Sequence, residues 1–293
     1  MIVIKNLTKK FPGVVAVNNL SLEVKPGING LIGENGAGKS TLLRLIADVY
    51  QVSDGEILID GKHHYEPEVK NNLFFLSDNP YYSTNMTPKE VIELYSSLFD
   101  LDKDKFFNIL NNLSLPNERR LSTYSKGMRR QLFLALSLSM NAQYILLDEA
   151  FDGLDPIVQD VVKQEIIENA SSKTFIMSSH NLLSLERLCD NFILLSRGRC
   201  TKNGGIEDMG KNFQKYQVIF KSPVKKEDLT ALGIHLISFK TVGSIHYIVV
   251  DGEEDAQLIR EKLEPTLMES VAIDTDELIT LEMIAQKEAN KDE

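Results

Sequence analysis

The chain is poor in cysteine and has no long hydrophobic run. Its 293 residues include two cysteines, Cys189 and Cys200, and so few exclude a disulfide framework and suit a reducing cytoplasm. The N-terminal residues lack the apolar segment of a secretory signal. The longest apolar stretches, such as residues 131–140, fall well short of the roughly 20 residues that a transmembrane helix needs. We therefore expect a chain that does not cross a membrane by itself.

The sequence also lacks an excess of basic residues. It has 32 Lys and Arg against 42 Asp and Glu, a net charge of −10, which argues against a protein that holds nucleic acid through its phosphates. The charge is unevenly spread, because residues 1–205 carry a net −2 and residues 206–293 a net −8. We therefore expect no nucleic-acid partner, and the acidic C-terminal part indicates a separate domain.

The first 205 residues alternate between short apolar runs and helical patterns, which predicts an α/β layered domain. Residues 28–32 form one short β-like run, which leads into a glycine-rich segment. Continuous apolar runs at residues 144–147, 174–177 and 192–195 are typical of parallel strands covered by helices on both faces. A helical pattern over residues 85–140 begins at Thr87, which is followed by proline and, three positions on, by Glu90. This stretch is predicted to be a helical insertion.

The C-terminal part has the pattern of a small α+β domain. Strands are predicted at 218–220, 235–239, 245–250 and 270–273, with helices at 226–232 and 255–263. This βαββαβ order is that of the ferredoxin-like unit. A last helix is predicted at 276–287, with Asp276 as its N-cap. We expect two domains, residues 1–210 and 211–293.

A glycine-rich segment, Gly33-Glu34-Asn35-Gly36-Ala37-Gly38-Lys39-Ser40, lies between a predicted strand and a predicted helix. Its two glycines five apart, followed by Lys and Ser, match a phosphate-binding loop, in which backbone N–H groups and the helix N-terminus surround an anion. Lys39 is expected to reach the β- and γ-phosphates, and the Ser40 hydroxyl to bind Mg²⁺.

Two adjacent carboxylates end the apolar run 144–147. Beside a phosphate loop, one carboxylate is needed to hold Mg²⁺ and a second to orient the attacking water. We assign the first role to Asp148 and the second to Glu149.

Together these residues resemble the ATP-binding cassette (ABC) ATPases across residues 1–205. Tyr124-Ser125-Lys126-Gly127-Met128 stands where that family has its signature, usually Leu-Ser-Gly-Gly-Gln, and residues 149–156 look like the stretch from the catalytic glutamate through the D-loop. Ser178-Ser179-His180 is similar to the segment of the switch histidine, and Phe11 lies where an aromatic ring stacks on adenine.

The resemblance implies a P-loop NTPase cassette with a RecA-like core, an antiparallel β part and a helical subdomain, and it implies ATP and Mg²⁺ as cofactors. The implied catalytic residues are Lys39, Glu149 and His180, and the implied metal ligands are Ser40, Asp78 and Asp148. The implied ATP-binding residues are Phe11, Gly33, Asn35, Gly36, Ala37, Gly38, Lys39, Ser40 and Thr41. In such cassettes the signature residues Ser125, Lys126, Gly127 and Met128 act on the ATP of a second cassette, and Gly153, Leu154 and Asp155 form the D-loop.

Some residues depart from the family pattern. Asp78 replaces the usual Q-loop glutamine, Lys126 the first signature glycine and Met128 the signature glutamine. Because Ser125 and Gly127 keep the positions that face phosphate, we expect activity. The charged pair Arg129-Arg130 is predicted to lie on a solvated face. The adjacent pair His63-His64 is a poor candidate for a metal site, because neighbours on a strand point to opposite faces.

The signature variant and residues 276–282 resemble the ATPase subunits of bacterial two-component exporters. This resemblance implies a separate membrane permease, docked near residues 78–98, a second cassette that is a copy or a paralogue, and a cytoplasmic location on the inner face of the cell membrane. A non-transport ABC ATPase, either regulatory or linked to nucleic acid or the ribosome, is the alternative. The roughly 90 residues between Gly33 and Ser125 leave no room for long coiled-coil arms.

Overall fold

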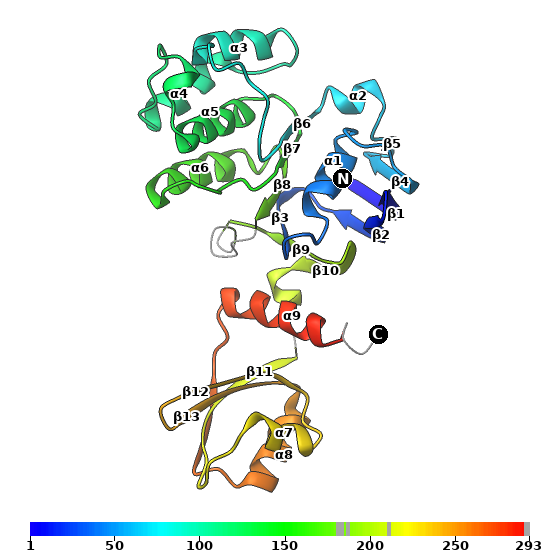
Figure 1. Cartoon of the computed structure of the whole chain (residues 1–293), viewed down its shortest axis with the longest axis vertical. Helices are drawn as coiled ribbons and strands as arrows, with labels where there is room; N and C mark the ends of the chain where they lie inside the picture. Colours follow the sequence, from blue (N-terminus) through cyan, green and yellow to red (C-terminus); the bar gives the residue numbers. More distant parts are fainter. Residues whose placement is uncertain (180–184, 186–187, 210–211, 290–293) are drawn as a thin grey trace. The chain divides into compact units, whose positions relative to one another are not determined.

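The computed structural model describes residues 1–179, 185, 188–209 and 212–289 (Figure 1). The chain divides into two compact units, Met1–Asn203 and Gly204–Glu293, so this division comes a few residues before the predicted boundary at 210. Among the residues described, no helix has the length and apolar character of a membrane span.

The first unit is built on a six-stranded sheet in the order β10-β9-β3-β8-β7-β6. Its central strands β3 (Gly27–Gly33), β8 (Thr174–Ser179), β7 (Tyr144–Leu147) and β6 (Leu73–Leu76) pair in parallel, as does β9 (Asn191–Ser196) with β3; β10 spans Arg199–Gly205. Every residue of β7 and β8 is buried. The carboxyl ends of parallel strands meet at one edge, which brings the residues after β3, β7 and β8 together.

A second sheet covers the helix that follows the glycine-rich segment. It has the order β2-β1-β4-β5 and consists of β1 (Ile2–Phe11), β2 (Val14–Val24), β4 (Asp54–Ile59) and β5 (Lys62–His63), all paired antiparallel. Apolar residues of β1 and β2 share one core with those of α1 (Lys39–Ile46) and with Leu146 and Ile176 of the large sheet. Packing against both sheets fixes the start of α1.

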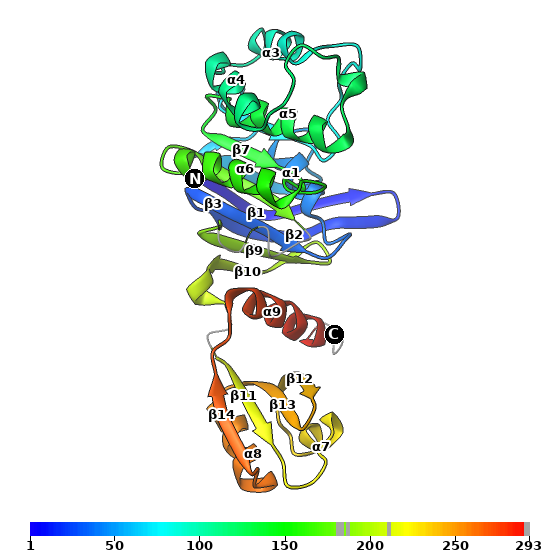
Figure 2. The same cartoon turned by 90° about the vertical axis from the view of Figure 1, so that its left-hand side faces the viewer.

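The helical insertion comprises α3 (Pro88–Ser96), α4 (Lys103–Asn112), the 3₁₀ turn Leu121–Thr123 and α5 (Lys126–Leu138). Helix α2 (Pro67–Lys70) comes earlier, between β5 and β6. Figures 1 and 2 show α3, α4 and α5 gathered at one end of this unit, with α6 (Pro156–Asn169) beside α5. Thr87 accepts a hydrogen bond from the Glu90 N–H and the Glu90 carboxylate accepts one from the Thr87 N–H, which confirms the predicted capping box.

The second unit has the ferredoxin-like topology that the sequence predicts. Its antiparallel sheet has the order β12-β13-β11-β14, formed by β11 (Phe213–Ile219), β12 (Leu236–Val242), β13 (Ile245–Asp251) and β14 (Leu267–Val271). Helices α7 (Lys226–Ala231) and α8 (Glu253–Leu263) pack on one face and α9 (Thr275–Ala289) on the other. A 3₁₀ turn, Ile206–Asp208, precedes β11.

The predicted N-cap of the last helix is wrong. Helix α9 begins at Thr275, and the Asp274 carboxylate accepts a hydrogen bond from the Glu277 N–H at 2.8 Å. Asp274 therefore caps the helix two residues before the predicted Asp276, because a capping side chain bonds the N–H two or three residues ahead.

Candidate functional site

The glycine-rich segment forms a tight loop between β3 and α1. Gly36 and Gly38 have positive φ angles of 84° and 105°, and a Cβ at Gly38 would come within 2.6 Å of the Ala16 carbonyl oxygen. A Cβ at Gly33 would lie 2.4 Å from the Leu195 carbonyl oxygen. These positions therefore need glycine, and the free N–H groups of the first turn of α1 face the loop.

The Lys39 side chain reaches back to the start of the glycine-rich loop. This side chain is buried, and its ammonium donates to the carbonyl oxygens of Gly33 at 2.7 Å and Glu34 at 3.2 Å. Burial lowers the pKa of Lys39, while the carboxylates of Glu149 and Asp148 act in the opposite direction. Since a desolvated ammonium is stabilised by a nearby anion, this position suits a phosphate group.

Asp148 is fully buried at the end of β7. Its Oδ1 accepts hydrogen bonds from the hydroxyls of Ser178 at 2.7 Å and Ser40 at 3.0 Å, whereas its Oδ2 has no hydrogen-bond partner among the described residues and lies 3.7 Å from an Arg44 nitrogen. Burial raises the pKa of Asp148, and the two hydroxyls and Arg44 partly offset this.

A divalent cation fits this arrangement of atoms. A buried carboxylate oxygen without a hydrogen-bond partner beside a serine hydroxyl is a pair of hard oxygen donors of the kind that Mg²⁺ prefers. The described residues contain no group of three His, Cys, Asp or Glu side chains that could hold a metal alone. Phosphate oxygens and water would therefore have to complete the coordination.

Asp78, the residue at the Q-loop position, pairs with Arg44 at 3.1 Å and is half exposed. Because Arg44 also approaches Asp148, its guanidinium stands between the two carboxylates that the sequence predicts as metal ligands. The role of Asp78 as a metal ligand stays a prediction.

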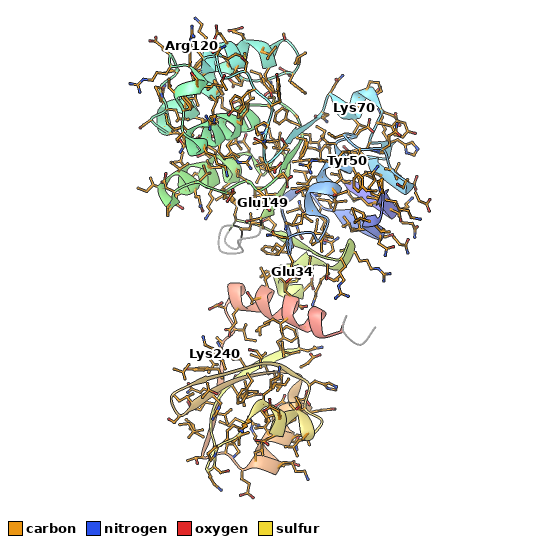
Figure 3. The ribbon with its side chains drawn as sticks, in the orientation of Figure 1. Glu34, Tyr50, Lys70, Arg120, Glu149 and Lys240 are labelled. Atoms are coloured by element: carbon orange, nitrogen blue, oxygen red, sulfur yellow. The ribbon has the colours of Figure 1, made fainter. Side chains whose placement is uncertain are left out.

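Glu149 follows Asp148 with a positive φ of 50°. A left-handed backbone at a residue other than glycine costs about 1–2 kcal/mol, so neighbouring contacts must hold it. The Glu149 N–H donates to the Ser178 hydroxyl at 2.8 Å, and its carbonyl oxygen accepts from Arg130 at 2.6 Å. Figure 3 labels Glu149 where β7 ends and Glu34 in the phosphate loop.

Ser178 has contacts in this cluster that sequence reasoning missed. Ser178 appears in the sequence only as context for His180, yet its hydroxyl bonds both Asp148 and the backbone of Glu149. Its position at the end of a buried strand next to β7 is the signal that could have identified it. His180 lies outside the described residues.

Arg130 corrects the prediction of a solvated arginine pair. It is 8% exposed, and its guanidinium donates to the carbonyl oxygens of Ser77, Asp78, Asp148 and Glu149. The signal in the sequence is helical spacing, because position 130 shares a face of α5 with the buried positions 133, 134 and 137.

The signature residues lie beside the D-loop of the same chain. Ser125 is the N-cap of α5 and accepts a hydrogen bond from the Met128 N–H at 3.1 Å, and a Cβ on Gly127 would lie 3.3 Å from the Gly153 carbonyl oxygen. The Lys126 ammonium is 3.6 Å from the Asp152 carboxylate, on the surface. Leu154 is buried, and Asp155 caps α6 by accepting from the Val158 N–H.

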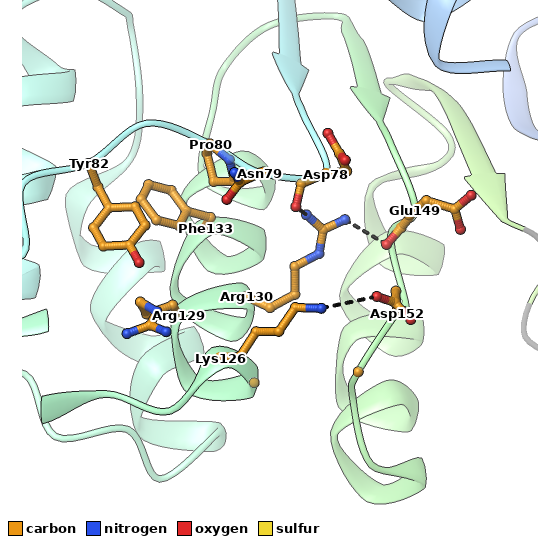
Figure 4. A pocket seen from close by; sticks show the side chains of 12 residues that line it. Asp78, Asn79, Pro80, Tyr82, Lys126, Arg129, Arg130, Phe133, Glu149 and Asp152 are labelled. Atoms are coloured by element: carbon orange, nitrogen blue, oxygen red, sulfur yellow. Dashed lines mark hydrogen bonds and ion pairs between the residues drawn. The ribbon is translucent and has the colours of Figure 1, made fainter. Parts of the chain in front are cut away.

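A cavity of about 370 Å³ opens between these segments (Figure 4). Its lining includes Lys126 and Gly127 of the signature, Glu149, and Gly153 of the D-loop. The phosphate loop contributes no residue to this lining, so within one chain the signature and the phosphate loop do not share this cavity.

Phe11 ends β1 as an aromatic platform. Its ring meets that of Tyr50 edge-on at 5.4 Å, and the Lys9 ammonium lies 5.0 Å from the Phe11 ring centre and 5.7 Å from that of Tyr50. Tyr50 was not predicted, because it reaches Phe11 only through the pairing of separate elements. A flat ring beside a cation suits a purine base that carries anionic phosphates.

An apolar groove of about 880 Å³ runs along β6, α3 and the segment between them. Its lining includes Phe74, Tyr82, Tyr95 and Phe99, and Tyr81 on its rim is 95% exposed. Large exposed aromatic side chains around an apolar groove indicate a surface for another protein.

Comparisons with known proteins give consistent matches. A family model described as ABC transporter matches residues 17–152. The chain is 28% identical over 289 residues to the ABC transporter ATP-binding protein YtrB of Bacillus subtilis, covering 95% of this chain and 96% of YtrB. It is 30% identical to the ABC transporter ATP-binding protein NatA of Bacillus subtilis, covering 71% of this chain and 91% of NatA.

Two further matches concern transport and fold. The chain is 28% identical to the lantibiotic transport ATP-binding protein SrtF of Streptococcus pyogenes, covering 75% of this chain and 99% of SrtF. Its structure is similar to the solved structure of an ATP-binding subunit of an ABC transporter, with a TM-score of 0.65 and 25% identity over 72% of this chain and 92% of that one.

Proposed function

The chain belongs to the ATP-binding proteins of ABC transporters, and from this premise we propose that it hydrolyses ATP between two cassettes to drive a separate membrane permease. The family, the cassette fold and the ATPase activity are those that the sequence predicts. The roles of individual residues, the dimer and the permease belong to the proposal.

The observation that carries the proposal is the convergence of Lys39, Ser40, Asp148 and Glu149 at one edge of the large sheet. The loop N–H groups and Lys39 would hold the phosphates, and Ser40 and Asp148 would hold Mg²⁺. A bound Mg²⁺ neutralises phosphate charge. Glu149 would accept the proton of the attacking water. Hydrogen bonds from its N–H to Ser178 and from Arg130 to its carbonyl oxygen hold its backbone beside the proposed metal site at Asp148.

The position of the signature supports a dimer. Ser125 and Lys126 are exposed, and the 370 Å³ cavity that Lys126 lines together with Gly153 of the D-loop has no phosphate-loop residue in its lining. A second cassette, a copy or a paralogue, would bring its Ser125 and Gly127 to the ATP held by the first. The N-terminus of α5 would then add a second favourable helix end for the phosphates.

The apolar groove supports a permease partner. Most of its lining comes from residues 74–99, a stretch that includes the region 78–98 that the sequence predicts for docking, and Asp78 is one of the lining residues. An apolar helix end of a membrane chain fits such a groove. Export as the direction rests on the signature variant, and the location on the inner face of the cell membrane follows from the permease.

The decisive experiment on hydrolysis is Glu149→Gln. We expect the steady-state ATPase rate to fall by about 10²- to 10⁴-fold, the usual contribution of a general base, while an ATP-bound dimer accumulates in size-exclusion chromatography with light scattering. An unchanged rate, or a monomer at saturating ATP, would contradict the proposal.

Docking is tested by co-expression with a candidate permease, a membrane protein chosen from the reading frames that adjoin the one of this chain. The double substitution Tyr81→Ala, Leu98→Ala removes two exposed apolar side chains at the groove and is expected to abolish co-purification. Tyr65→Ala, an exposed tyrosine outside the groove lining, is the control and is expected to leave it intact. Equal recovery of the membrane protein by both variants would remove the groove as the docking site.

A further inference from the structure

Arg130 joins two stretches of main chain that are far apart in the sequence. Its Nη1 donates to the carbonyl oxygens of Ser77 at 3.0 Å and Asp78 at 3.3 Å, and its Nη2 donates to those of Asp148 and, at 2.6 Å, of Glu149. Figure 4 shows the guanidinium between the Asp78 segment and Glu149. One buried side chain therefore fixes the end of β7 to the segment after β6.

The contacts are with backbone rather than with side chains. Arg130 is 8% exposed, and burying a guanidinium is unfavourable unless its donors are paired. Four carbonyl oxygens pair its two terminal nitrogens, in the forked geometry that only arginine offers among the basic residues. The Nε is buried and has no hydrogen-bond partner among the described residues. Such a set of bonds constrains where the main chain lies, not only how charge is distributed.

Glu149 is where this constraint has the greatest effect. Its left-handed φ of 50° is unfavourable for glutamate, and its N–H and carbonyl groups are held by Ser178 and Arg130 respectively. The Glu149 carbonyl oxygen also accepts a hydrogen bond from the Asp152 N–H at 3.1 Å. Removal of the charged Arg130 donor would therefore weaken the restraint on the carbonyl side, so the backbone could relax and move the Glu149 carboxylate.

The other end of the contact reaches the apolar groove. Ser77 and Asp78, whose carbonyl oxygens Arg130 binds, line the groove, and so does Phe133, one turn further along α5. A change in the groove that shifts these residues would therefore shift Arg130, and through its hydrogen bond the Glu149 backbone.

We infer that Arg130 is a positioning residue that holds the Glu149 backbone in its left-handed conformation and ties it to the segment of Ser77 and Asp78. The inference rests on the proposed function, because it requires Glu149 to be the residue that activates water. It extends that function by adding a residue whose bonds are to main-chain carbonyl oxygens and which acts through the glutamate.

The test is a double-mutant cycle on single-turnover ATP hydrolysis in the full chain. Arg130→Gln alone is expected to lower the rate of hydrolysis by about 10- to 100-fold, the effect of losing hydrogen bonds from a charged donor. The dissociation constant for ATP, measured by calorimetry, should change by less than about twofold. Arg130→Lys, which keeps the positive charge on a single donor nitrogen without the fork, should have an intermediate rate.

The control is Arg260→Gln. Arg260 is an exposed arginine of α8 in the second unit, close to the Tyr216 ring, so its loss should change the rate by no more than about twofold. Added to Glu149→Gln, the substitution Arg130→Gln should cause almost no further loss, because the two residues act through one group.

Full additivity of the two losses, or a rise in the ATP dissociation constant that accounts for the lower rate, would overturn the inference while leaving the proposed function intact. An unchanged rate for Glu149→Gln alone would overturn the proposed function and this inference with it. If thermal unfolding shows that Arg130→Gln does not fold, Arg130→Lys takes its place in the cycle. The single-turnover rate and the ATP dissociation constant are then measured for that variant.

Discussion

The two units of the chain bury polar side chains in different ways. In the first, a lysine, an arginine, an aspartate and a serine (Lys39, Arg130, Asp148 and Ser178) are buried around the place where β3, β7 and β8 end. In the second, the residues between the sheet and its helices are apolar, and the buried Asp255 accepts a hydrogen bond from the His235 N–H. Since burial of polar groups costs free energy, their concentration at one edge of the first unit is best explained by a ligand.

The comparison predicts that the second unit depends mainly on apolar packing. Ile248 is fully buried between the sheet and the helices α7 and α8. Ile248→Ala should therefore lower the free energy of unfolding by about 2–5 kcal/mol, measured by chemical denaturation. Val242→Ala, at a position that is 54% exposed, is the control, and a loss of similar size there would show that this unit is not held by its core.

For the first unit we expect an effect on catalysis rather than packing. Ser178→Ala removes the hydroxyl that bonds Asp148 and the Glu149 backbone, and the turnover number should fall about tenfold or more. Ser137 is also fully buried, but its hydroxyl bonds the Phe133 carbonyl within α5. Ser137→Ala should leave turnover within about twofold, and equal losses in the two variants would refute a special role for Ser178.

Replacing a buried aspartate by asparagine should change the free energy of unfolding in opposite directions in the two units. Asp255→Asn weakens an acceptor that the fold uses and should lower the free energy of unfolding by about 1 kcal/mol. Asp148→Asn replaces a carboxylate whose pKa is raised by burial, so in the absence of nucleotide it should increase stability while abolishing turnover. Thermal unfolding with and without ATP would show whether the signs differ.

The sign of the pH dependence follows from the raised pKa of Asp148. A carboxyl group whose pKa is higher in the folded than in the unfolded chain favours folding at a pH below its ordinary value of 3.8, and this contribution is lost as the pH rises through its folded pKa. The stability advantage of Asp148→Asn over the natural chain should therefore widen as the pH increases. A difference in stability between the two chains that stays the same as the pH increases would contradict this prediction.

The smallest effects concern ion pairs. Lys126 and Asp152 in the first unit are exposed, and Lys126→Gln should change the free energy of unfolding by no more than about 0.5 kcal/mol. Lys215 and Glu277 in the second unit are 2.5 Å apart and mostly buried, so Lys215→Gln should cost more, about 1 kcal/mol or above. A larger cost for Lys126→Gln would mean that this pair serves stability.

Local patterns predicted the parts of the site that lie within one segment. The phosphate loop, Asp148 and Glu149 are each marked by a short motif next to a strand, and the order βαββαβ sufficed for the topology of the second unit. The contacts of Arg130, Ser178 and Tyr50 could not be predicted in this way, because their partners come from other elements. The position of the Asp274 cap was missed by two residues, since both aspartates suit the start of a helix.

The hydroxyl of Ser125, which caps α5, has a further use besides starting the helix. A serine hydroxyl has one hydrogen to donate, and the oxygen of Ser125 already accepts from the Met128 N–H. Its hydrogen is therefore left to donate to a group outside the helix that Ser125 begins. In the proposed dimer that hydrogen would be given to a phosphate oxygen of the partner cassette's ATP, so the bond that begins a helix would also prepare Ser125 to act as a donor.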